Sequence, residues 1–340
     1  MSAGSVVGID VGGSGLRGRA VRGDLVVAEL SVPGPVRISG ESLAPRVGEL
    51  VRALAGDARS VAIGCAGVAT FGAALRDPLV AAVPQTARVL VCSDLLIAYV
   101  GGLGLTAAEV TGDGGAGVVL AAGTGAVAFG GSAAAGWRRA DGWGHLLGDD
   151  GGGAWIGRAG MRAALRARDG RPGGSAVLLE LLLAGVGEPS AVVAELTGRA
   201  DRAGMMAAFA PAVISAAVRD PVAAAILDRA AGHLADTARA VVRQASADPA
   251  RAAGDRPSAD TAGAAGRLAP TLPSPGVVVV GNLVRPGGGL AARVEEAFRA
   301  RGLTPGPAAG SPVDGAVVLA ATHGAVPGAL AAAGALTVHR

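Results

Sequence analysis

Residues 6–21, VVGIDVGGSGLRGRAV, hold the pattern that decides the fold. A short apolar run leads into a glycine-rich turn and returns as a second run, which is typical of two strands joined by a tight turn. The same order recurs at residues 117–131, GVVLAAGTGAVAFGG. A glycine-turned hairpin at the head of each half predicts a duplicated α/β chain with a boundary near residue 111.

The segments that follow each hairpin alternate between helix and strand, as in βαβ units. After the first hairpin we expect a helix from Glu41, strands at VAIGCAG (61–67) and RVLVCSD (88–94), and a helical run from Asp94. In the second half we expect helices over about 152–168, 175–196, 205–218 and 221–246, a strand at VVVVGN (277–282), and a last strand and helix within 313–326.

These elements predict two domains. Residues 1–111 would form the first, with a C-terminal helix at 323–340 as a candidate to complete it, and residues 112–322 would form the second, with helical insertions. Residues 247–275 are rich in Pro, Ala, Gly, Asp and Ser without periodicity, so we expect a mobile loop there. No signal peptide opens the chain, and the uncharged stretch 114–137 reads as strand, turn and strand, so we expect a cytoplasmic protein without a membrane segment.

Composition excludes several classes of protein. The chain has no lysine, and Schiff-base aldolases, pyridoxal-phosphate enzymes, Walker-A NTPases and ordinary protein kinases all need one at a fixed place. A net charge of +3 and 2% aromatic residues argue against a nucleic-acid partner, because phosphate neutralisation and base stacking need both kinds of side chain.

The two glycine turns are candidates for phosphate binding. Glycine lets backbone N–H groups approach phosphate oxygens without a Cβ in the way, and the hydroxyl of Ser14 can add a further donor. An ordinary glycine-rich hairpin is the alternative for either turn alone, but two turns at equivalent points of a duplicated chain favour a nucleotide. The residues assigned to phosphate are Gly12, Gly13, Ser14, Gly123, Thr124 and Gly125.

Two aspartates end strands beside these turns. Asp10, at the end of the first strand, is placed to hold a Mg²⁺ ion through its water shell. Asp94, at the start of a helical run, can accept a proton from a substrate hydroxyl as general base of a phosphoryl transfer. Its alternative role is that of a helix N-cap, for which Asp is among the preferred residues.

The segment 142–157, GWGHLLGDDGGGAWIG, carries two of the three tryptophans and a pair of acids among seven glycines. An indole ring against the apolar face of a sugar, with a carboxylate on its hydroxyls, is a common way to hold a carbohydrate. A rigid loop that only caps the following helix is the alternative.

At these residues a family resemblance becomes specific. GIDVGGSG, SD before a helix, AAGTGAVAFG and GWGHLLGDDGGGAWIGRAG look like the N-acetylglucosamine kinase branch, with the benzoyl-CoA reductase activase-type ATPases, of the actin-like sugar kinase/Hsp70 ATPase superfamily. The likeness runs from residue 5 to about 325, and its most specific part is the GWG…GD stretch. It implies two duplicated actin-like (ribonuclease H-like) α/β domains with an ATP cleft between them.

The resemblance also implies roles for single residues. Asp10 would lie near Mg²⁺, Asp94 would be the catalytic base, and the turn residues Ser14 and Thr124 would contact ATP phosphates. The sugar would be bound by Asp94, Gly142, Trp143, Gly144 and Asp149, and the adenosine would lie near Ala210, Gly281 and Arg285.

The reaction expected from this resemblance is ATP-dependent phosphorylation of an amino sugar, N-acetylglucosamine, at O6, by a homodimer. Departures from the family pattern put the sugar in question: Asp150 and Gly152 stand where Glu and Ser are usual, Ala126 where Ser is usual, and Arg37 near an expected Asn. A kinase for glucosamine, N-acetylmuramic acid or a similar sugar therefore stays open. So do a catalytically silent sugar sensor and an activase-type ATPase with an iron–sulfur cluster, although Cys65 and Cys92 both lie in apolar strands.

Overall fold

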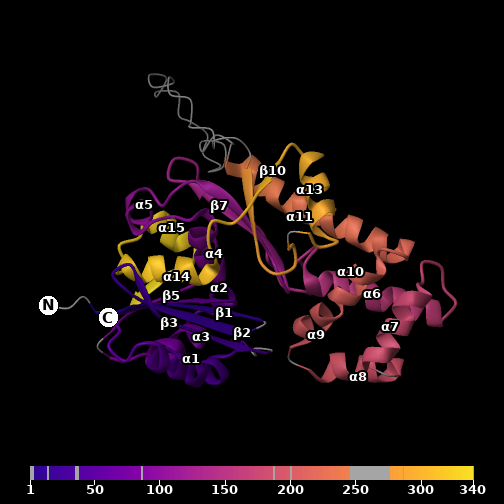
Figure 1. Ribbon diagram of the computed structural model, residues 1–340, viewed down its shortest axis with the longest axis horizontal. Coiled ribbons are helices and arrows are strands. Elements are labelled where there is room, and N and C mark those ends of the chain that lie inside the picture. The colour runs from indigo at the N-terminus through magenta and orange to yellow at the C-terminus, as the bar shows by residue number, and fades with distance from the viewer. Residues whose placement is uncertain are drawn as a thin grey trace, which may run out of the picture.

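The computed structural model describes residues 4–13, 15–34, 38–85, 87–186, 188–199, 201–245, 276–285 and 287–339. Ser14, Arg37 and the predicted loop 247–275 lie outside this range. The chain forms two β-sheets with helices packed around them (Figure 1). This is an α/β architecture with two sheets, as the sequence predicts.

The first sheet has six strands in the order β11-β5-β4-β1-β2-β3. Their bounds are β1 (Val6–Gly12), β2 (Gly15–Arg22), β3 (Leu25–Pro33), β4 (Ser60–Cys65), β5 (Arg88–Cys92) and β11 (Thr337–His339). The predicted first hairpin is present, since β1 and β2 pair antiparallel up to Gly12 and Gly15. Parallel pairing of β1 with β4, and of β4 with β5, brings the carboxyl ends of all three strands to one edge.

The second sheet repeats the hairpin. Its order is β10-β9-β6-β7-β8, with β6 (Gly117–Ala122), β7 (Ala126–Ser132), β8 (Gly136–Asp141), β9 (Gly276–Val280) and β10 (Thr304–Gly306). β6 and β7 pair antiparallel across the turn 123–125, and β9 pairs parallel with β6. Both glycine turns thus stand at equivalent ends of the central strand of their sheet.

Helices of the first half cover the outer face of its sheet. They are α1 (Gly40–Leu54), α2 (Val68–Phe71) and α3 (Ala73–Ala81), whereas α5 (Ala107–Gly112) lies away from that face and buries Val110 in the core between the two sheets. The predicted apolar face of α1 is buried, and its members are Leu43, Val47, Leu50, Val51 and Leu54. Ser39 caps α1 by accepting the N–H of Ser42.

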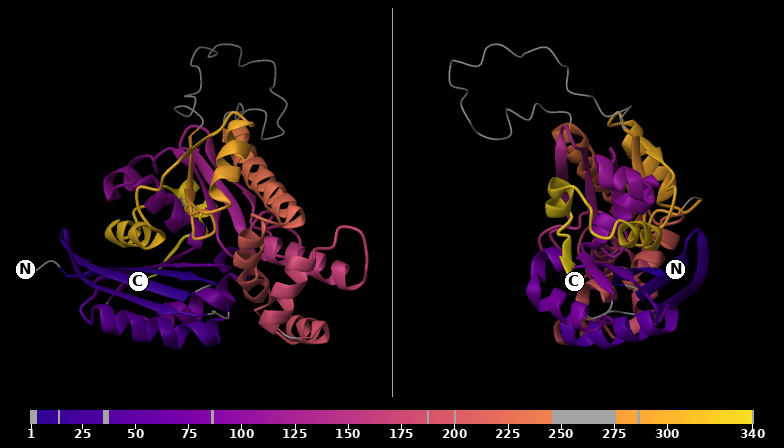
Figure 2. Two further views of the ribbon diagram at one scale, coloured as in Figure 1. Left: turned by 45° about the vertical axis from the view of Figure 1, so that its right-hand side comes forward. Right: turned by 90° about the vertical axis from the view of Figure 1, so that its left-hand side faces the viewer.

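Two apolar helices, α4 (Asp94–Leu103) and α14 (Pro312–Ala321), fill the space between the sheets (Figure 2). Their backbones touch, because a Cβ on Gly101 would lie 2.0 Å from the carbonyl oxygen of Ser311. A Cβ on Gly8 of β1 would likewise lie 2.4 Å from the backbone nitrogen of Val317. The prediction of a strand within 313–326 is wrong, because its first part forms the helix α14, whose apolar residues over 313–320 are buried or half-buried.

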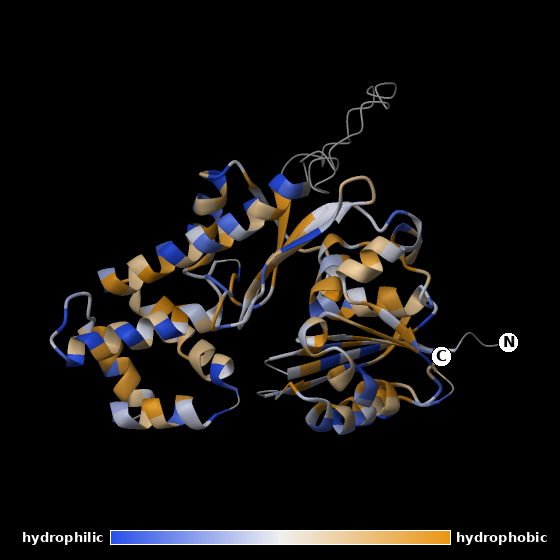
Figure 3. Cartoon of the chain, turned by 180° about the vertical axis from the view of Figure 1, so that it is seen from behind, coloured by the Kyte–Doolittle hydropathy of each residue, from blue (hydrophilic) through white to orange (hydrophobic). Residues whose placement is uncertain are grey.

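The remaining helices belong to the second half. They are α6 (Gly153–Arg168), α7 (Ala176–Val186), α8 (Pro189–Gly198), α9 (Arg202–Ala208), α10 (Ala210–Ala216), α11 (Pro221–Ala245), α13 (Ala291–Arg299) and α15 (Gly328–Ala333). The long helix α11 packs on β6, β7 and β8, and Figure 3 shows alternating hydrophobic and hydrophilic bands along it. The expected single helices 175–196 and 205–218 are each two, since Pro189 and Pro211 sit at the starts of α8 and α10 and cannot continue a preceding helix.

The C-terminal residues return to the first sheet, where β11 pairs with β5. Within the expected helix 323–340 the structure has α15 over Gly328–Ala333, followed by this strand. The predicted boundary at 111/112 falls at the end of α5 and stays a prediction. Over the described residues, no helix on its own is both long and apolar enough to cross a membrane, while two sharply bent helix pairs pass that test by length and composition alone.

Candidate active site

The two glycine turns meet at the edge where both hairpins end. A methyl group placed on Gly13 would lie 3.6 Å from Thr124 Oγ1, so the turns face each other directly. A Cβ on Gly12 or on Gly123 would meet no atom within 4 Å. Both glycines therefore leave backbone open on the side from which an anion can approach.

Asp10 lies in β1 with 8% of its surface exposed. Arg17, its cross-strand partner in β2, approaches it with 3.5 Å between Nη1 and Oδ2. Burial raises the pKa of Asp10 to about 6, although Arg17 opposes the shift. Because little water reaches this carboxylate, a neighbouring cation would stabilise its ionised form.

Asp94 is the first residue of α4, but the cap of this helix is Ser93. The Ser93 hydroxyl accepts the N–H of Leu96 at 3.3 Å and donates to the carbonyl oxygen of Gly334 at 2.9 Å. The N-cap role that sequence reasoning left open for Asp94 thus belongs to its neighbour. Capping of α4 therefore does not depend on the Asp94 carboxylate.

The environment of Asp94 suits a proton acceptor. Burial, above all, and the nearby charge of Asp10 raise its pKa to about 6, while the N–H of Leu95 opposes the shift. Asp149 adds a smaller effect in the raising direction. Asp10 and Asp149 come from distant parts of the sequence, and both act electrostatically on Asp94, so the fold brings both of them near Asp94.

Asp149 touches the second glycine turn. A Cβ on Gly125 would lie 2.6 Å from Asp149 Oδ2, and the carboxylate accepts the backbone N–H groups of Ala126 and Gly144. Burial raises the pKa of Asp149, and these two hydrogen bonds oppose the shift. Gly125 therefore differs from Gly123. The space beside Gly125 is filled by the Asp149 carboxylate, whereas the space beside Gly123 is open.

The first residues of α6 donate hydrogen bonds to the same turn. The N–H of Gly153 donates to the carbonyl of Gly123, and the N–H of Ala154 to that of Thr124, both at 2.8 Å. A Cβ on Gly152 would lie 2.7 Å from the carbonyl carbon of Gly125. Sequence reasoning missed this contact, although the run of three glycines before α6 was its signal.

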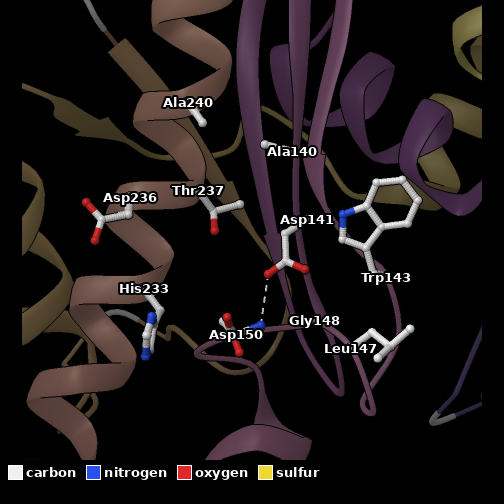
Figure 4. A pocket seen from close by; sticks show the side chains of 10 residues that line it. All are labelled: Ala140, Asp141, Trp143, Leu147, Gly148, Asp150, His233, Asp236, Thr237 and Ala240. Carbon is white, nitrogen blue, oxygen red and sulfur yellow. Dashed lines mark hydrogen bonds between the residues drawn. The ribbon is translucent and has the colours of Figure 1, made fainter.

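The stretch 142–150, which we call the GWG loop, exposes its apolar side chains. Trp143 is 68% exposed, and the guanidinium of Arg139 lies 4.6 Å from the centre of its ring. A cavity of about 360 Å³ lies between this loop, β8 and α11; in Figure 4 the α11 side chains stand on one side of Asp141, with Trp143 and Leu147 on the other. The residues that line this cavity include none from either glycine turn.

The residues assigned to adenosine lie on two elements. Gly281 follows β9 with φ 106°, and a Cβ there would lie 2.2 Å from the carbonyl oxygen of Ala122. Arg285 is exposed in the next loop, which reaches α10 where Gly289 faces Ile214. Ala210, the first residue of α10, is buried, so only its backbone can face a nucleotide.

The two cysteines do not resemble cluster ligands. Cys65 and Cys92 are fully buried at the ends of β4 and β5, and burial raises the pKa of both thiols. Iron–sulfur clusters are held by thiolates, so this arrangement speaks against the activase-type alternative.

Comparisons with known proteins bear on the fold and the family of this chain. A curated relative, the N-acetylmuramic acid/N-acetylglucosamine kinase of Clostridium acetobutylicum, is 27% identical over 187 residues, which are 52% of this chain and 57% of that protein. Among solved structures, the putative N-acetylglucosamine kinase of Chromobacterium violaceum has a TM-score of 0.67 at 24% identity and covers 94% of this chain and 99% of its own. The putative N-acetylglucosamine kinase of Porphyromonas gingivalis has a TM-score of 0.61 at 19% identity, with the same coverage.

At these sequence identities, the similarity to the solved structures shows that the fold is shared. The family comparison goes further, because it matches residues 7–253, which contain both glycine turns, Asp94 and the GWG loop. The family resemblance inferred from the motifs is confirmed. The chain belongs to the BadF/BadG/BcrA/BcrD ATPase family.

Proposed function

We propose that this protein is an ATP-dependent kinase that phosphorylates a hydroxyl of an amino sugar, with N-acetylglucosamine as substrate and O6 as the acceptor. The observation that carries the proposal is the meeting of two glycine turns beside Asp94, whose pKa is raised to about 6. The ATPase family and the names of the relatives support the same reading. The homodimer stays a prediction.

In this proposal the ATP phosphates contact the turns at Gly12, Gly13, Gly123 and Thr124. In the described part of these turns, the donors available to the phosphates are backbone N–H groups and the Thr124 hydroxyl. Adenosine lies against the loop from Gly281 to Arg285 and the start of α10. Gly142, Trp143, Gly144 and Asp149 hold the sugar.

The residues present fit a Mg²⁺ ion. Among the described residues, no three His, Cys, Asp or Glu side chains gather as a protein-only metal site. Mg²⁺ commonly uses one or two carboxylates together with water and substrate phosphates, and Asp10 offers one such nearly buried carboxylate. When bound, the ion would neutralise charge on the phosphates; Asp10 would hold it.

Asp94 supplies the proton chemistry. Its carboxylate accepts the proton of the sugar hydroxyl as that oxygen bonds to the γ-phosphorus, the bond from phosphorus to the bridging oxygen breaks, and ADP leaves. A base with a pKa near 6 is ionised at neutral pH and still basic enough to take part. Most of the rate enhancement would come from positioning the two substrates.

A coupled assay of ADP release across N-acetylglucosamine, glucosamine, N-acetylmuramic acid and anhydro-sugars tests the proposal. We expect turnover of N-acetylglucosamine, with a product whose phosphorus couples to the C6 protons in NMR. Turnover of another sugar alone would change the substrate and keep the kinase. No turnover of any sugar, with ATP bound, would favour the silent sensor.

Gly123→Val should weaken ATP binding. The added side chain enters space that holds no atom within 4 Å of a Cβ, so the folded protein tolerates it while phosphate is excluded. We expect the Kd for ATP, measured by calorimetry, to rise at least about 10-fold, the scale of one or two lost charged hydrogen bonds. An unchanged Kd would remove this turn from the nucleotide site.

The free protein should become less stable as pH rises from about 4 to 6. A carboxyl whose folded pKa is raised from 3.8 to about 6, as for Asp94, binds its proton more tightly in the folded state, so ionisation costs folding free energy. Urea unfolding without ATP or Mg²⁺ should show a midpoint that falls over this interval. Asp94→Asn should flatten that slope, and an equal slope in both proteins would contradict the assignment.

A further inference from the structure

The carboxylate of Asp141, which has no role in the proposed reaction, joins the two ends of the GWG loop. Its Oδ1 accepts the backbone N–H of Asp149 at 2.7 Å, and its Oδ2 accepts that of Asp150 at 2.9 Å, the bond marked in Figure 4. Asp141 is the last residue of β8, so these bonds fix the exit of the loop to its entry.

The backbone around Asp141 is built for this contact. Asp141 and Asp149 both have left-handed backbone conformations, with φ of 61° and 58°, which non-glycine residues keep only where their surroundings determine it. A Cβ on Gly148 would lie 2.3 Å from Asp141 Oδ1, so glycine at this position makes room for the carboxylate.

The contact continues to the second glycine turn through Asp149. With its N–H held by Asp141, Asp149 places its carboxylate against Gly125 and on the N–H groups of Ala126 and Gly144. One connected set of hydrogen bonds thus runs from the end of β8 through the loop to the turn.

We propose that Asp141 is a positioning residue that acts through Asp149, orienting its carboxylate for the sugar while the loop stays fixed to the turn. The inference rests on the proposed function, in which Asp149 binds the sugar. A carboxylate suits this place because each of its two oxygens accepts one of the two N–H donors. An asparagine would offer one oxygen and turn an NH₂ group toward the second donor.

Steady-state kinetics of Asp141→Ala and Asp141→Asn in the full chain test this role. We expect the KM for the sugar to rise about 10-fold to 100-fold in Asp141→Ala, the scale of losing hydrogen bonds to a charged acceptor, and less in Asp141→Asn. The Kd for ATP without sugar should stay near that of the wild type. Hydrogen exchange at the amides of residues 149 and 150 should be faster in both variants.

Asp113→Ala is the matched control. The Asp113 carboxylate also accepts a backbone N–H two residues on, that of Gly115 at 2.9 Å, but it lies at the exposed end of α5. This variant should keep the sugar KM of the wild type. An equal rise in both variants would mean a general effect on folding and would overturn the inference.

A double-mutant cycle with Asp149→Asn separates positioning from independent effects. If Asp141 acts through Asp149, Asp141→Ala should add little to the sugar KM once Asp149 is replaced. Additive effects would overturn the inference, as would faster amide exchange with an unchanged sugar KM. A wild type that turns over no sugar overturns the proposed function itself, whereas an active wild type whose Asp141→Ala variant keeps the sugar KM overturns this inference alone.

Discussion

Asp94→Asn is expected to lower kcat at least about 100-fold, the usual scale for a general base, while ATP still binds. The same substitution should stabilise the free protein at pH 7. Ionising a carboxyl whose pKa is raised from 3.8 to about 6 costs on the order of 3 kcal/mol in the folded state, and a neutral amide avoids that cost.

The test is strong because the expected changes in activity and in stability have opposite signs. Loss of activity through misfolding would come with a lower Tm, whereas loss of a base should come with a higher one. Asp57→Asn is the control, since Asp57 is an exposed carboxylate of the same domain, paired with Arg22, and should change neither quantity much. Near-full activity in Asp94→Asn would exclude Asp94 as the base.

Gly101→Val is expected to have the largest effect on stability. The backbones of α4 and α14 touch at this point, where a Cβ would lie 2.0 Å from the carbonyl oxygen of Ser311. A backbone atom cannot rotate away as a side chain can, so the helices must separate and expose the core between the two sheets. We expect a loss of about 3 kcal/mol or more, at the upper end of overpacking effects.

Urea unfolding measures this loss. Gly112→Val is the matched control, because Gly112 is also a helical glycine, the last residue of α5, but a Cβ there meets no atom within 4 Å. Its stability should stay within about 0.5 kcal/mol of the wild type, as for most surface substitutions. Equal stability of the two variants would contradict the close approach of α4 and α14.

Local patterns predicted most of the fold and part of the site. Alternating apolar runs around glycines give both hairpins, and apolar spacing gives α1 and its buried face. Where local pattern failed, burial was the reason: the run 313–320 is a helix whose apolar residues are all buried or half-buried, and such a run has no clear periodicity by which to tell it from a strand.

The sequence by itself determined the residue types of the site: two glycine turns, an aspartate after a strand, and a loop of glycines, tryptophan and acids. These depend on short-range chemistry, since a bare backbone or a carboxylate at a strand end can be read within a few residues. Only the tertiary structure decided how they cooperate. Asp149 lies against Gly125, and Asp94 lies near Asp10, across 24 and 84 positions of the chain. Such contacts come from two sheets packed on α4 and α14, and long-range packing of this kind leaves no periodic trace in the sequence.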